Sequence, residues 1–86
     1  MIEVRIYECE PFQPAREFAV VTVDGNGVLI TAADPFAQRV KEIRLIDPKT
    51  DEQLTAQSHP ERWARLLPSA WRTPYMRATV TRDEPA

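Results

Sequence analysis

The sequence predicts an α+β fold: a small antiparallel sheet of three to five strands, with two helices packed on one face. Two observations predict it. Several short stretches alternate apolar and polar residues or are rich in β-branched ones, as strands are. Two other stretches, at about 35–43 and 59–72, place apolar residues at helical spacing. The 86 residues are expected to form a single domain, 1–86.

The first strand is expected at residues 2–8, where apolar and polar side chains alternate. A β-hairpin is expected at residues 17–32. Its two arms contain many β-branched residues, and the sequence Asp-Gly-Asn-Gly at 24–27 separates them. Asp-Gly and Asn-Gly supply the positive φ angles that tight hairpin turns require, so this is the strongest local signal in the chain.

A proline-bounded segment, Pro-Phe-Gln-Pro at residues 11–14, separates the first strand from the hairpin. Proline has no N–H to donate to a sheet, so regular pairing cannot continue through it. The spacing also matches the P-x-x-P pattern of ligands that bind as polyproline helices. Because so short a match arises often by chance, we interpret the segment as a rigid loop between strands.

The first helix is expected over 35–43. Asp34 can cap its free amides, and Pro35 suits the first helical position, where the missing N–H has no partner anyway. Three apolar residues then recur at i, i+4 and i+7. After this helix, Asp47-Pro48 favours a turn, and the short apolar pairs on either side of it are interpreted as a second small hairpin.

The second helix is expected over 59–72, starting with a capping box formed by Ser58 and Glu61. Pro68 is expected to break it. A closing strand should follow, with Met76, Ala78 and Val80 facing inward, and then a frayed tail at residues 83–86. The apolar stripe of this broken helix is predicted to pack on the sheet and comprises Trp63, Leu66, Leu67 and Trp71.

The net charge of −2 is unevenly distributed. Residues 1–59 carry six basic and ten acidic groups, whereas residues 60–82 carry five arginines and one glutamate. A basic segment on an acidic body indicates either a binding surface or two parts that attract each other. The excess of nine arginines over two lysines is typical of GC-rich bacterial coding.

The basic segment supplies the candidate binding surface. An aromatic residue among arginines is the combination that stacks on bases and contacts phosphates. The tryptophans are better explained as core, although the sequence leaves open whether Trp71 and Tyr75 are buried. The candidate surface residues are Arg62, Arg65, Arg72, Tyr75 and Arg77.

The sequence indicates no metal, cofactor or catalytic constellation. His59 and Cys9 are the single histidine and cysteine and are separated by fifty residues, without ligand spacing. Ser58 and His59 are neighbours in an expected helix cap, where adjacent side chains should not face each other, so they make a poor nucleophile–base pair. No phosphate-binding glycine loop is present either.

These observations favour a non-enzymatic protein-interaction or accessory module, with a protein partner or self-association through an exposed strand edge. The alternative is nucleic-acid binding by the arginine face, which the acidic pI of 5.3 disfavours. An enzyme that uses carboxylates alone ranks third. One cysteine, no secretory segment and no membrane-length apolar run predict a cytoplasmic protein without membrane contact.

Overall fold

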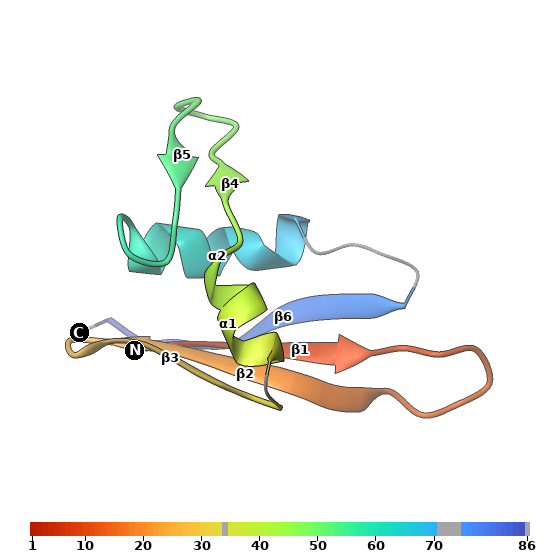
Figure 1. Ribbon diagram of the computed structural model, residues 1–86. Helices are drawn as coiled ribbons and strands as arrows, with labels where there is room; N and C mark the ends of the chain where they lie inside the picture. Colours follow the sequence, from red (N-terminus) through yellow and green to blue (C-terminus); the bar gives the residue numbers. More distant parts are fainter. Residues whose placement is uncertain (34, 71–74, 86) are drawn as a thin grey trace.

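A four-stranded antiparallel sheet forms the base of the molecule, and two helices and a two-stranded hairpin lie on one of its faces (Figure 1). The computed structural model describes residues 1–33, 35–70 and 75–85. The predicted α+β fold is confirmed. The elements in chain order are β1 (Ile2–Glu8), β2 (Arg16–Asp24), β3 (Gly27–Ala32), α1 (Phe36–Lys41), β4 (Leu45–Ile46), β5 (Gln53–Leu54), α2 (Pro60–Ala70) and β6 (Met76–Asp83).

The strands of the large sheet lie in the order β3-β2-β1-β6, so the first strand pairs with the last one. This pairing extends past β6, because the backbone N–H of Glu84 donates to the Met1 carbonyl at 2.8 Å. The N-terminal ammonium of Met1 donates in return to the Glu84 carbonyl at 2.6 Å. Residues 83 and 84, predicted from sequence as part of a frayed tail, therefore have partners that lie more than eighty positions away along the chain.

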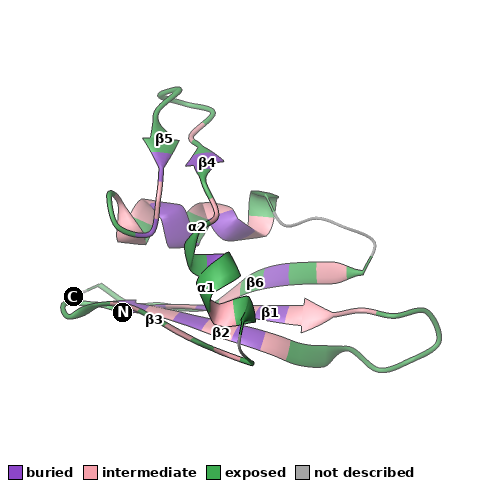
Figure 2. Cartoon of the chain, viewed as in Figure 1, coloured by how far each residue is buried: buried purple, intermediate pink, exposed green. Residues whose placement is uncertain are grey.

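The core lies between the sheet and α2 (Figure 2). Alternate residues of β1 and β2 point toward α2 and are almost wholly buried, as the period of a strand requires. From the other side α2 contributes Trp63 and Leu67, both fully buried. The indole N–H of Trp63 donates to the Ile43 carbonyl at 2.9 Å, so the ring packs without losing a hydrogen bond. The predicted core role of Trp63 is confirmed, whereas Trp71 lies outside the described residues.

Helix α2 differs from its prediction at Pro68. The sequence predicted a break there, but the helix continues through Pro68 to Ala70. Proline lacks the N–H that would bond the carbonyl four residues earlier, but its fixed φ is compatible with a helix, and only two residues of α2 follow it. The preceding residue, Leu67, is fully buried and anchors this turn against the sheet.

The start of α2 also differs in detail. The helix begins at Pro60, but the hydroxyl of Ser58 does not complete the predicted capping box with Glu61. It accepts the backbone N–H of Thr55 at 3.0 Å instead. Helix α1 is shorter than the predicted 35–43, and its expected cap, Asp34, lies outside the described residues.

Both predicted hairpins are present. Strands β2 and β3 pair in register from Ala19↔Ala32 to Asp24↔Gly27. Strands β4 and β5 pair over two residues each, and their hairpin rises above α2 (Figure 1). Met76, Ala78 and Val80 of β6 contribute to the core, as predicted.

Candidate functional site

Arg62, the first residue of the predicted arginine surface, holds the β4–β5 hairpin to α2. One of its terminal nitrogens donates to Asp47 Oδ2 at 2.6 Å and to Thr50 Oγ1 at 3.2 Å. Its other terminal nitrogen lies 3.6 Å from a carboxylate oxygen of Glu52. The guanidinium is therefore already surrounded by acceptors from its own chain.

Arg65 is occupied in the same way. It donates two hydrogen bonds of 3.1 Å to the carboxylate of Asp83 at the end of β6, in a fork-like arrangement. Glu61, one turn earlier on α2, lies 3.9 Å from it. Arg62 and Arg65 are thus both paired with acidic groups of their own chain. This agrees with one of the two interpretations of the uneven charge, that the basic and acidic parts attract each other.

The remaining predicted surface residues do not join these two. Arg77 is an exposed residue near the start of β6, whereas Arg65 contacts the far end of that strand. Tyr75 is exposed, and its carbonyl accepts the backbone N–H of Cys9 at 2.7 Å. Arg72 lies outside the described residues. The described part of the predicted surface is therefore not one continuous basic patch.

The ion pairs shift the pKa values of their carboxyl groups in the expected direction. Hydrogen bonds from Arg62 and from the Lys49 backbone hold the pKa of Asp47 below its usual value. The hydrogen bond from Arg65 does the same to the pKa of Asp83. These carboxylates thus stay charged, and they offset the arginines that the sequence had assigned to phosphate contacts.

Ser58, His59 and Glu52 lie in a row that resembles a catalytic arrangement. The Nδ1 atom of His59 is 3.0 Å from Ser58 Oγ, and its Nε2 atom is 3.7 Å from Glu52. The expectation that neighbouring Ser58 and His59 side chains would not meet was therefore wrong. The Ser58 hydroxyl, however, also bonds the backbone N–H and the hydroxyl of Thr55. We interpret these contacts as a structural bracket that leads the chain into α2.

A polar pocket of about 500 Å³ lies between α1 and the segment that joins β5 to α2. Two cationic side chains line it, Lys41 and Arg44, and one anionic side chain, Glu42. Glu42 accepts the amide N–H of Gln38 at 3.0 Å. All these side chains are exposed, and no polar or charged side chain is buried in the part of the chain that the structure describes. The pocket is therefore lined by polar side chains that are exposed to solvent.

None of the described helices lies on the opposite face of the large sheet (Figure 1). At its centre, Arg5 donates to Glu3 at 2.6 Å and to Glu17 at 2.8 Å. The hydrogen bond from Arg5 is the main cause that lowers the pKa of Glu3. From the strand register, the described residues that point to this uncovered face include Glu3, Arg5, Tyr7, Val20, Thr22, Leu29, Thr31, Arg77 and Thr79.

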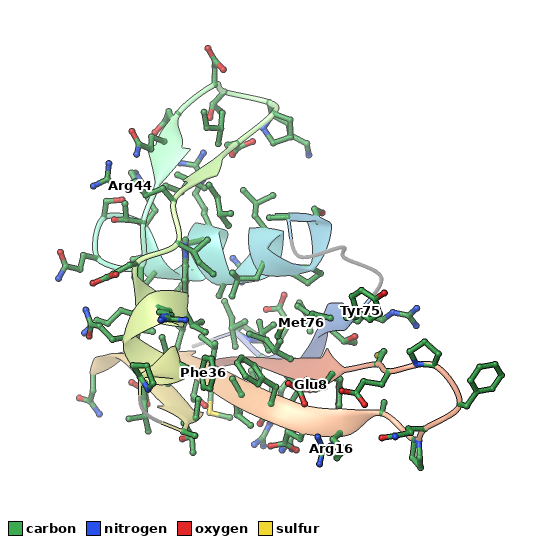
Figure 3. All side chains as sticks on the ribbon, turned by 45° about the vertical axis from the view of Figure 1, so that its right-hand side comes forward. Glu8, Arg16, Phe36, Arg44, Tyr75 and Met76 are labelled. Carbon is green, nitrogen blue, oxygen red and sulfur yellow. The ribbon has the colours of Figure 1, made fainter. Side chains whose placement is uncertain are left out.

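Large apolar side chains are exposed on several separate elements. Phe12 is wholly exposed in the loop between β1 and β2, and Leu29 is 67% exposed on β3. Ile46 on β4 is 63% exposed. In Figure 3, Glu8 and Arg16 mark the base of the Phe12 loop, with Tyr75 on the same end of the sheet and Arg44 on the other side of the molecule.

Ile46 borders a second pocket, of about 220 Å³, between β4 and the last turns of α2. This apolar pocket is lined by Leu45, Ile46, Pro48, Leu66, Ser69 and Ala70. Sequence reasoning missed it, because its two walls come from elements that are separated by most of a hairpin and a helix. The helical stripe that contains Leu66 was the only local signal of it.

No protein-family model matches the chain, and neither a curated protein nor a solved structure is detectably similar to it. None of the described helices is long and apolar enough to cross a membrane. Within residues 1–33, 35–70 and 75–85, no three metal-ligating side chains converge.

Proposed function

We propose that this protein is a non-enzymatic interaction module that binds protein, including a second copy of itself, along an edge of its sheet. The observation that carries the proposal is the uncovered face of the sheet together with the free edge of β3. An edge strand offers unpaired N–H and C=O groups to another strand.

The two outer strands of the described sheet differ in how well they suit this role. Strand β6 carries Arg77 and Arg82 and has an irregular register with β1 near Val4. Charges and bulges are the features by which natural edges resist pairing. Strand β3 reads Gly-Val-Leu-Ile-Thr-Ala, without a charge, and pairs regularly with β2. The β3 edge is therefore the better candidate for strand addition.

Sedimentation of the chain from low to high micromolar concentration tests the proposal. We expect reversible association, and we expect Leu29→Lys to weaken it at least tenfold, because lysine on an edge strand opposes pairing. Thr79→Lys is the matched control, since it adds the same charge to the same face on β6, the strand at the other edge. A chain that stays monomeric at high micromolar concentration would contradict self-association.

The nucleic-acid alternative has its own readout. Binding of labelled DNA or RNA at low salt that falls steeply with added salt would favour it. The ion pairs of Arg62 and Arg65 with carboxylates reduce the positive charge that the α2 side offers to phosphates. We therefore expect no salt-sensitive binding there.

A further inference from the structure

The loop between β1 and β2 contains a tight turn with an unusual residue in it. The backbone N–H of Gln13 donates to the Glu10 carbonyl at 3.3 Å, which closes a four-residue turn. Pro11 occupies the second position and Phe12 the third, with a φ of 63°. A positive φ at the third position, after proline, is the pattern of a type II turn, where glycine or asparagine is normal. For a bulky residue this φ costs roughly 1–2 kcal/mol.

Burial of the Phe12 ring does not offset that cost within the described residues. Phe12 is wholly exposed, so its ring gains nothing from burial in its own chain. In the isolated fold the strain at Phe12 is therefore not balanced by burial of its ring. Residues with this kind of strain cluster at binding and active sites, and the exposure of the ring points to a contact outside the monomer.

The apolar pocket between β4 and α2 has the size and lining to receive a phenyl ring. Its volume is about 220 Å³, and an apolar cavity of ~150 Å³ is enough to admit benzene. Its walls are mainly aliphatic, and Ile46 at its rim is otherwise exposed. A ring inserted there would remove apolar surface from water on both partners.

Charges next to the loop and the pocket are complementary. Glu10 opens the Phe12 turn, and Lys49 follows Pro48 at the rim of the pocket. Among the described residues neither side chain takes part in an ion pair. When the ring enters the pocket, the two charges can approach each other, which would steer the encounter.

The loop cannot reach the pocket of its own chain. It projects beyond the end of the sheet, whereas β4 and α2 lie above the sheet's covered face (Figure 1). We propose that Phe12 of one copy inserts into the apolar pocket between β4 and α2 of a second copy, with Glu10 facing Lys49. This inference rests on the proposed self-association but places a contact outside the β3 edge. A reciprocal pair would close as a dimer, whereas head-to-tail contacts would form rings or chains.

Sedimentation equilibrium of the full chain tests the contact. Phe12→Ala should weaken association at least tenfold, since it removes the ring, while the melting temperature of the monomer stays unchanged or rises. Tyr75→Ala is the matched control, because Tyr75 is an exposed aromatic at the same end of the sheet, outside the proposed contact. Equal association of Phe12→Ala and the wild type would overturn the inference.

A charge exchange tests the proposed contact between Glu10 and Lys49. Glu10→Lys and Lys49→Glu should each weaken association several-fold, and the double variant should restore it, because the two charges then attract again. Single effects that simply add in the double variant would overturn the Glu10–Lys49 contact. A wild type that is monomeric removes the proposed self-association altogether. A wild type that associates, together with a Phe12→Ala variant that associates equally well, contradicts only this contact and leaves the β3 edge as the site.

Discussion

The two ends of β2 are connected in opposite ways. At its C-terminal end, the turn to β3 places Gly27 at a φ of 120°, and the Asn26 N–H bonds the Asp24 side chain at 2.7 Å. At its N-terminal end, the loop from β1 places Phe12 at a φ of 63°. One connection uses a residue that adopts positive φ without steric cost, and the other uses a large aromatic residue that does not.

In a third connection, positive φ again falls on a residue type that tolerates it. In the β4–β5 hairpin, Asp51 has a φ of 60°, but Asp tolerates this region better than most residues. Its N–H donates to the Asp47 carbonyl at 2.8 Å, and Arg62 holds the turn to α2. All three turns contain a local hydrogen bond, but residue choice explains the positive φ only at Gly27 and Asp51, and the exposed ring of Phe12 is not held by burial either.

The largest effect on stability is expected at Gly27. Gly27→Ala should destabilise the fold by roughly 1–3 kcal/mol, because the new side chain has free space but an unfavourable φ. Gly25→Ala is the matched control two residues earlier: it also has free space and no positive φ, so its effect should be small or slightly stabilising. Urea denaturation measures both. Equal effects of the two would remove the backbone argument from this side of the comparison.

A smaller effect of opposite sign is expected at Phe12. Phe12→Gly should stabilise the monomer by up to about 1 kcal/mol, since relief of roughly 1–2 kcal/mol of strain exceeds the entropic cost of glycine. Phe12→Ala keeps a Cβ and therefore most of the strain, so it should gain less. Denaturation at a concentration where the chain is monomeric is the measurement. A loss of stability in Phe12→Gly would mean that the ring does contribute to its own fold.

The smallest effect is expected in the β4–β5 connection. The pKa of Asp47 is lowered in the fold, so its contribution is present above the unfolded pKa near 4 and is lost as the pH falls through the folded value. Asp47→Asn should therefore lower the melting temperature slightly at pH 7 and by less at pH 3. A difference as large at pH 3 as at pH 7 would show that Asp47 acts through something other than its charge.

Much of the architecture could be predicted from local chemistry. The alternation in residues 2–8 matches the bounds of β1, and the Asp-Gly-Asn-Gly turn located the β2–β3 hairpin. The candidate surface could be predicted less well. Arg62 and Arg65 were recognised as basic, but their partners Asp47 and Asp83 lie fifteen and eighteen positions away. Which charges pair over that separation depends on how the helices and strands pack against one another. The periodicity of apolar residues along the sequence contains no information about that packing.

The sequence by itself determined the elements, because turn residues, strand alternation and helical spacing act within a few positions of one another. It also contains Phe12 between two prolines, but the positive φ and the full exposure of that residue could not be predicted from the sequence. Only the tertiary structure decided that α2 runs on through Pro68, that the arginines of α2 face carboxylates, and that β4 and α2 enclose an apolar pocket. Each of these depends on contacts between distant segments, whose energies exist only once the chain has brought the segments together.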